Sequence, residues 1–266
     1  MFLNTFINRI ERLGRATIKL LGNFGASCIF VFKGWFQVFV PPFRPHLIMV
    51  QILQIGVNST LVIALIGFFT GAVLAVQGEY VLSQFGVAAY TGSMVALSLI
   101  RELGPVLTAL MVIGRAGSAM TAELGIMRIT EQIDALKSMA VDPIKYLISP
   151  RLLAGIISVP LLTIIFIVVG IFGGYVVSIG ILGLSSGTFI ARMQSSVKMV
   201  DLYSGFIKSI VFGFIFGWVS AYQGYTCGFG AVGVNKATTR AVVTASVAIL
   251  VVDYFLASIL TRVFLG

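Results

Sequence analysis

Five long apolar runs, separated by polar segments, limit what this chain can fold into. They fall at residues 47–76, 93–117, 148–182, 203–222 and 241–262. About 20 apolar residues cross the ~30 Å hydrocarbon core of a bilayer, so each run is long enough to span a membrane. A spanning helix satisfies its own backbone hydrogen bonds in hydrocarbon. We therefore predict an all-α polytopic integral membrane protein with five transmembrane helices.

Composition and charge exclude the soluble classes. The chain is 58% hydrophobic and 10% charged, whereas soluble domains carry about 25% charged residues. The net charge of +9 would suggest nucleic acid in a soluble protein. Here the basic residues flank apolar runs, so topology and anionic lipid explain them and no nucleic-acid partner is predicted. The two cysteines, Cys28 and Cys227, are predicted to be free, and a single histidine, His46, leaves no paired-histidine metal motif.

The first 46 residues are predicted to form a segment of their own, ahead of a transmembrane domain at 47–266. Residues 2–21 have helical apolar spacing with basic residues on the other side, which is typical of a helix lying in the membrane interface. Residues 24–40 are apolar but contain Lys33 and end at a Pro-Pro pair. We interpret them as interfacial or re-entrant. The alternative is a true span with a snorkelling lysine.

Basic residues predict the orientation in the membrane. If the N-terminus is cytoplasmic, the inner segments hold most of the 18 Lys and Arg residues. The outer segments then hold only Arg192, Lys198 and Arg262. By the positive-inside rule this predicts a cytoplasmic N-terminus, an extracytoplasmic C-terminus and a cytoplasmic segment at 118–146.

Two charged residues, Arg101 and Glu102, lie inside the second apolar run. Charges at that depth are costly unless they face a cavity or a partner. Pro105 cannot donate a hydrogen bond to the Arg101 carbonyl, so the helix should bend there. We interpret these features as a polar patch on a substrate cavity. The alternative is a structural arrangement buried against other helices.

Lys208 and Asp253 are predicted to form a structural pair within the membrane. At ~1.5 Å per residue, their depths in the fourth and fifth runs differ by ~5 Å, which a lysine side chain can cover. Successive spans joined by a short loop are usually neighbours. The alternative is that Asp253 is protonated or bonded to Ser or Thr side chains.

An amphipathic helix is predicted at residues 126–140, ended by Asp142-Pro143. Its apolar stripe consists of Ile126, Ile129, Ile133, Leu136 and Ala140. We interpret the helix as docking into a groove on a soluble partner. The alternative is a helix resting on the membrane surface, but nearby acidic residues make it less basic than such a helix should be.

No catalytic apparatus is evident. The chain has no Gly-Lys dipeptide and therefore no P-loop, so any ATP would be hydrolysed by a separate chain. A different class, an ion-coupled transporter or channel, would use Arg101, Glu102 and Asp253 as a relay. A membrane-embedded lipid enzyme would need a catalytic constellation that the sequence does not contain.

Several segments resemble one known family. RELGPVLTALMVIGRAGSAMTAELG, TEQIDAL, MAVDP and ISPRLLAG together resemble the MlaE permeases of bacterial phospholipid-transport ABC systems. Further matches are KSIVFG and NKATTRAVV near the end. The similarity covers essentially the whole chain, and a match this long is far more specific than any short motif.

The resemblance implies a non-catalytic, homodimeric permease in the bacterial inner membrane that moves phospholipids to or from an MCE-domain protein on its outer side. It implies a cytoplasmic ABC ATPase dimer that uses ATP and Mg, often with a STAS-domain protein, and no cofactor in this chain.

The resemblance also implies two groups of site residues. Those expected to contact lipid are Val81, Leu82, Phe85, Arg101 and Glu102. The cytoplasmic helix that couples to the ATPase corresponds to about residues 119–141, with Glu123, Arg128, Glu131, Ile133, Asp134 and Leu136 as the coupling residues.

Overall fold

The computed structural model describes residues 14, 18, 21–22, 25–41 and 44–265. The amphipathic helix predicted at 2–21 lies almost wholly outside these residues. All regular structure in the described part of the chain is helical, with the following bounds after a first helix that covers residues 25–38: α2 (Pro45–Ile52), η1 (Leu53–Val57), α3 (Asn58–Gln84), η2 (Ala88–Tyr90), α4 (Thr91–Ser98), η3 (Leu99–Leu103), α5 (Gly104–Val112), η4 (Ile113–Gly117), α6 (Ser118–Ile129), α7 (Gln132–Ser138), η5 (Ile144–Ile148), α8 (Ser149–Gly180), α9 (Ser186–Ser196), α10 (Met199–Tyr225) and α11 (Gly230–Leu265).

Within the described residues, five helical runs are long and apolar enough to cross a membrane, which confirms the predicted number. They are Pro45–Gln84, Ala88–Ile129, Ile144–Gly180, Met199–Tyr225 and Gly230–Val263. Their lengths of 27 to 42 residues correspond to about 40 to 63 Å, more than the ~30 Å hydrocarbon core. The helices therefore extend beyond the membrane, and most of the polar segment between the fourth and fifth apolar runs is the first part of α11.

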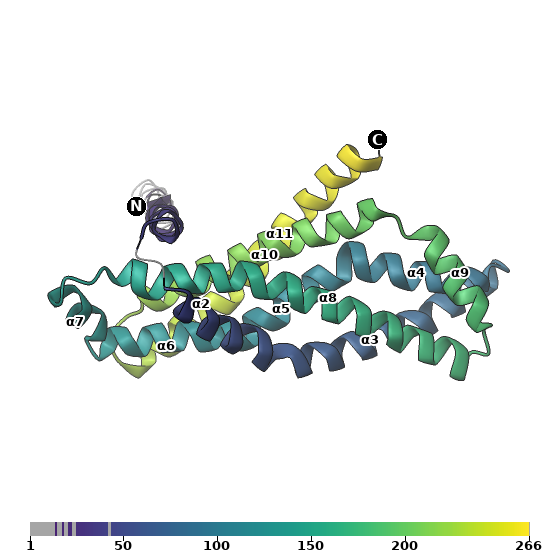
Figure 1. Ribbon diagram of the computed structural model, residues 1–266, viewed down its shortest axis with the longest axis horizontal. Helices are drawn as coiled ribbons and strands as arrows, with labels where there is room; N and C mark the ends of the chain where they lie inside the picture. Colours follow the sequence, from purple (N-terminus) through teal and green to yellow (C-terminus); the bar gives the residue numbers. More distant parts are fainter. Residues whose placement is uncertain (1–13, 15–17, 19–20, 23–24, 42–43, 266) are drawn as a thin grey trace, which may run out of the picture.

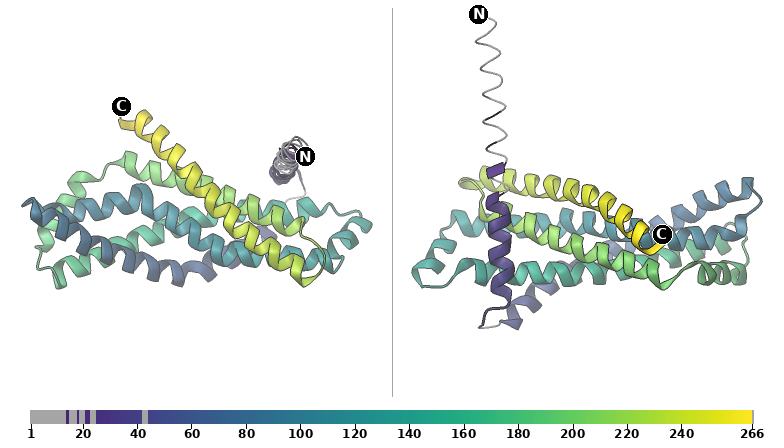
Figure 2. Two further views of the ribbon diagram at one scale, coloured as in Figure 1. Left: turned by 180° about the vertical axis from the view of Figure 1, so that it is seen from behind. Right: turned by 90° about the horizontal axis from the view of Figure 1, so that it is seen from above.

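The spanning helices lie along the long axis of the molecule, with α7 at one end and α9 towards the other (Figure 1). The helix at residues 25–38 instead runs across the bundle (Figure 2). Trp218 in α10 donates to the Ser27 hydroxyl at 2.8 Å, and Ser149 in α8 donates to the Gly34 carbonyl at 2.8 Å. The helix therefore lies across the five spans and not parallel to them (Figure 2), and its interfacial placement stays a prediction.

Glycines allow α3 to approach α8 closely. A Cβ atom on Gly67 would lie 2.8 Å from the Phe166 carbonyl oxygen, and one on Gly71 would overlap the Gly170 carbonyl. The backbones therefore meet where the small-residue spacing allows them to. A second contact of this kind joins α10 to α8, where a Cβ on Gly213 would lie 2.6 Å from the Gly155 carbonyl oxygen.

The continuous helix predicted at 126–140 is wrong. Helix α6 ends at Ile129, Glu131 adopts the left-handed conformation with φ 59°, and α7 begins at Gln132. A straight continuation would carry Ile133 away from the bundle, whereas the turn places it in the core with 0% exposure. Burying an isoleucine gives about 1.5–3 kcal/mol, which offsets the ~1–2 kcal/mol cost of a left-handed residue.

Candidate functional site

Five charged side chains gather where η3 meets α10 and α11. They are Arg101 and Glu102 of η3, Asp201 and Lys208 of α10, and Asp253 of α11. Asp201, Lys208 and Asp253, which are distant in the sequence, thus lie around Arg101 and Glu102 of the second apolar run.

Pro105 determines the local backbone of this site. Proline has no N–H group, and just before it the helix widens into the π-helical turn η3, in which the Gly104 N–H donates to the Leu99 carbonyl five residues back. Such turns are frequent at functional sites. A Cβ on Gly205 would overlap the Ile100 carbonyl, so α10 lies directly against the turn. This close approach brings Lys208, one helical turn further on, to Glu102.

Lys208 joins three of the spanning helices. Its side chain is 0% exposed, and its Nζ lies 3.0 Å from Asp253 Oδ1. The structure therefore contains the pair inferred from membrane depth. The same Nζ also contacts Glu102 Oε2, a partner that the depth argument did not identify. A buried ammonium is costly without compensating charge, and here two carboxylates compensate for it.

Arg101 pairs with a second buried carboxylate. Its Nε and Nη2 lie 2.7 and 2.5 Å from Asp201 Oδ1, and the Asp201 side chain is 3% exposed. The other oxygen, Oδ2, accepts the Lys198 backbone N–H at 2.8 Å. Asp201 thus satisfies the N-terminus of α10, where negative charge is favourable, and also holds Arg101. An acidic residue at the start of an apolar run is typical of a helix N-terminus, and this is the signal in the sequence that could have identified Asp201.

The cluster holds two cations and three carboxylates, a formal charge of −1 if all are ionised. The pocket beside it is lined by Arg101, Glu102 and Asp201 and has a volume of about 50 Å³. That is room for a few water molecules and far below the size of sites for larger ligands. In the single chain, the cluster ties the second, fourth and fifth spans together. Phosphate binding by Arg101 stays a prediction.

The five residues expected to contact lipid do not lie together. Val81, Leu82 and Phe85 are at the end of α3, and Phe85 is 75% exposed. A Cβ on Gly78 would lie 3.0 Å from Met94 Sδ, which fixes how α3 and α4 lie alongside each other. From that point Val81, Leu82 and Phe85 lie towards α9 and Arg101 lies in the opposite direction, so that they are separated by about 15 to 21 Å along the helices. The charge cluster and the apolar tip of α3 are two separate places.

The residues expected to couple to an ATPase differ in their surroundings. Glu123 Oε2 lies 2.9 Å from Nη2 of Arg151, which is 3% exposed, so Glu123 holds α6 to α8. Ile133 is fully buried within its own chain, so the prediction that it faces a partner is wrong. Leu136 packs against the core, and Arg128 lies in the last turn of α6.

Two exposed members of this group remain available at the tip of the molecule. Glu131 is exposed at the turn before α7. Asp134 is exposed in α7 and accepts a hydrogen bond from Lys137 at 2.7 Å. This bond lowers the pKa of Asp134 and raises the pKa of Lys137. Both groups are therefore charged at neutral pH, and α7 presents them beyond the end of the bundle (Figure 1).

Comparison with known proteins identifies the family. The family model described as Permease MlaE matches residues 48–259. The chain belongs to the MlaE permease family. It is 43% identical over 257 residues to the intermembrane phospholipid transport system permease protein MlaE of Haemophilus influenzae, covering 96% of this chain and 98% of that protein.

Two further MlaE-like relatives widen the comparison. A probable ABC transporter permease protein of Rickettsia typhi is 42% identical over 257 residues, covering 97% of this chain and 99% of the relative. The chloroplastic protein TRIGALACTOSYLDIACYLGLYCEROL 1 of Arabidopsis thaliana is 36% identical over 208 residues, covering 78% of this chain and 59% of that protein. The MlaE match contains every candidate site residue named above, whereas the crosswise helix at 25–38 precedes it.

Proposed function

We propose that this chain is the permease subunit of an ABC transporter that moves phospholipids between the bacterial inner membrane and an extracytoplasmic MCE-domain protein. The observation that carries the proposal is the near full-length similarity to the phospholipid transport permease of Haemophilus influenzae. The five spans and a sequence without a P-loop support a membrane subunit whose energy comes from another chain.

A cytoplasmic ABC ATPase dimer binds the end of the bundle that carries α7, and it uses ATP and Mg. The exposed charges of Glu131 and Asp134 at that end support this placement. The positive-inside distribution of Lys and Arg supports a cytoplasmic α7 and N-terminus and a periplasmic C-terminus. The MCE-domain protein then meets the end that carries α9, and a STAS-domain protein accompanies the ATPase.

The permease acts as a homodimer. The most apolar window of α11 is only 11% buried in the single chain, against 33–50% for the other four spans. The C-terminal half of α11 also leans away from the bundle (Figure 2). A second copy packed against this face would bury apolar side chains that the single chain leaves uncovered.

Purification and transport together test this function. The tagged chain, purified from native membranes in mild detergent, should bring down an ABC ATPase and an MCE-domain protein. The reconstituted complex should move fluorescent phospholipid only with ATP, and the chain alone should not hydrolyse ATP. Specific ATP hydrolysis by the chain alone, or transport driven by an ion gradient without ATP, would exclude the proposal.

A further inference from the structure

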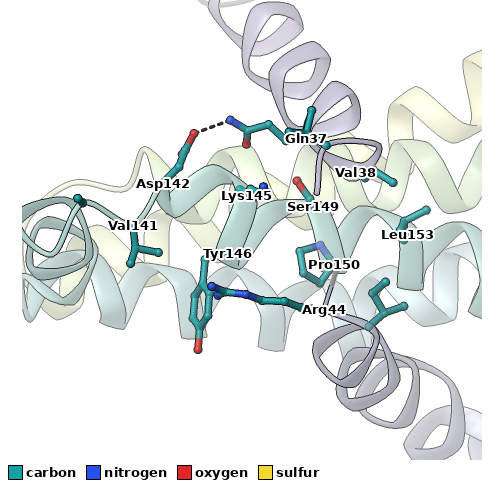
Figure 3. Close-up of a pocket in the computed structure, with 13 residues that line it drawn as sticks. Gln37, Val38, Arg44, Val141, Asp142, Lys145, Tyr146, Ser149, Pro150 and Leu153 are labelled. Carbon is teal, nitrogen blue, oxygen red and sulfur yellow. Dashed lines mark hydrogen bonds between the residues drawn. The ribbon is translucent and has the colours of Figure 1, made fainter. Parts of the chain in front are cut away.

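A cavity of about 340 Å³ lies near the α7 end, where the crosswise helix at 25–38 and the start of α2 meet the segment that leads into α8. Figure 3 shows Arg44, Lys145 and Asp142 around it, with Tyr146 below and Leu153 to one side. The cavity belongs neither to the charge cluster nor to the exposed tip of α7. Nothing in the proposed transport function uses it.

Two cations, Arg44 and Lys145, line this cavity. The Arg44 guanidinium stacks 5.0 Å from the centre of the Tyr146 ring, and Lys145 Nζ donates to the Pro41 carbonyl at 2.7 Å. Among the described residues, neither makes an ion pair. The one acidic lining residue, Asp142, accepts from the Ile144 N–H at 2.9 Å and from the Gln37 amide. These contacts fix both cations in place, and with two cations and one carboxylate among the described lining residues the cavity carries a formal charge of +1.

The position of the cavity along the spans is that of lipid head groups. Arg44 immediately precedes the first span, and Lys145 and Tyr146 lie in the first turns of the third. Lysine, arginine and tyrosine at the ends of spans mark the membrane–water interface. Basic pockets between helices at this level bind lipid head groups.

The rest of the lining identifies the ligand. Val38, Ile48 and Leu153 give the cavity an apolar side, which a free inorganic phosphate would leave in contact with water. Asp142 and the Gln37 side-chain carbonyl, which has no donor among the described residues, are hydrogen-bond acceptors. They favour a head group that ends in a hydroxyl or ammonium over one that ends in choline.

We propose that this cavity binds a glycerophospholipid of the adjacent leaflet, with its phosphate between Arg44 and Lys145 and an acyl chain along Ile48 and Leu153. Charge-assisted hydrogen bonds from both cations would hold the phosphate. The lipid fills the angle between the crosswise helix and the bundle. This inference requires only that the chain is a membrane protein, and a failure of the transport proposal would not affect it.

Photolabelling of the full-length protein in nanodiscs tests the site. The probe is phosphatidylglycerol with a photoactivatable group on one acyl chain, and labelled peptides are mapped by mass spectrometry. Arg44→Gln/Lys145→Gln should reduce labelling of the peptides that contain Ile48 or Leu153 by about tenfold. Lys236→Gln/Arg240→Gln is the matched control, because it removes two exposed cations from the start of α11 at the same end. It should leave this labelling unchanged.

Lys145 also donates a hydrogen bond to the Pro41 carbonyl. Arg44→Gln alone therefore serves as a second variant, because it keeps this hydrogen bond. It should fold normally and still lose labelling. Probes with a choline head group should label wild type several-fold less. Equal labelling of wild type and both variants would overturn the proposal. Complete displacement of the probe by inorganic phosphate would also overturn it, by indicating a plain anion site.

Discussion

Lys208 contributes one positive charge where carboxylates from two other helices, Glu102 and Asp253, meet. Its side chain is fully buried, so removing the charge leaves two carboxylates facing each other with no cation between them. Removing one member of a buried ion pair lowers the stability of the fold more than replacing all members by uncharged residues, because an uncompensated charge remains.

Lys208→Met should therefore lower the free energy of unfolding by about 3 kcal/mol, the lower end of the range for buried pairs, since Glu102 is half exposed. The triple variant that adds Glu102→Gln and Asp253→Asn should regain most of that loss. Thermal unfolding in detergent measures both. A triple variant no more stable than Lys208→Met would show that these ion pairs do not hold the three helices together. If the triple variant is stable but transports no lipid, the charges act in transport as well.

At the scale of single residues, one ion pair could be predicted from the sequence and two others could not. The Lys208–Asp253 contact followed from depth, because the rise per residue is fixed within a helix. Arg101–Asp201 and Lys208–Glu102 depend on which helices are neighbours around the bundle, and depth does not contain that information. The π-helical turn before Pro105 also changes the direction in which the Arg101 and Glu102 side chains point. The periodicity of a regular α-helix cannot predict this change.

The helices pack at distances set by glycine. A Cβ atom on Gly71 would overlap the Gly170 carbonyl, whereas one on Gly114 would meet nothing within 4 Å. Both glycines lie within helical runs, but only Gly71 is in contact with the backbone of a neighbouring helix. Long apolar runs made the number and type of these elements predictable. Their ends were not, because α11 continues as a helix through Asn235, Lys236 and Arg240 outside the apolar core.

Gly71→Ala should separate α3 from α8 and destabilise the protein by more than about 2 kcal/mol, as overpacking against rigid backbone does. Gly114→Ala, the matched control, should be neutral or slightly stabilising, since alanine restricts the unfolded chain. Melting temperatures of the two purified variants in the same detergent decide this. Equal melting temperatures would argue against close packing at Gly71.

The turn between α6 and α7 is the other element whose form the sequence did not indicate. Glu131 takes a left-handed conformation with neither glycine nor asparagine to signal it. The reason is burial of Ile133, which is a tertiary effect. Ile133→Asp would therefore disrupt folding as well as any docking and is not a clean test of an interface.

Glu131→Lys is the cleaner test of α7 as the docking element. A positive charge facing the partner should lower lipid-dependent ATPase activity of the assembled complex by about tenfold, since mismatched charge across an interface costs over ~1.4 kcal/mol. Gln194→Lys places a charge on exposed α9 at the other end and should have little effect. Normal coupling in Glu131→Lys would place the ATPase contact elsewhere.

In the whole molecule, apolar and charged sites are arranged along the long axis of the helical bundle (Figure 1). The exposed tip of α3, the charge cluster, the cavity at Arg44 and the tip of α7 follow one another from the α9 end to the α7 end. The residues expected to contact lipid lie at the first two of these places. The pocket that Arg101, Glu102 and Asp201 line in the single chain is only about 50 Å³, so the proposed second copy would have to enlarge it for a lipid to pass there.

A photo-crosslinker at Leu82, Phe85 or Glu102 should therefore capture phospholipid in cells more efficiently than one at Val168, several-fold in labelled fraction. Val168 is a fair control because it is 61% exposed on α8 and faces away from the core. Equal labelling at all four positions would indicate general lipid contact without a route.

The three-helix contact of Lys208 also has a consequence for biosynthesis. The second span, with Glu102, is made first, so a carboxylate is already in the membrane when Lys208 arrives in the fourth span. Asp253 is made last, in the fifth. A nascent chain that ends before Asp253 has one carboxylate for the ammonium, and completion of the fifth span adds the second. The fifth span thus adds a second partner to a lysine that entered the membrane before it, and the ion-pair cluster is complete only once the fourth and fifth spans are both in place.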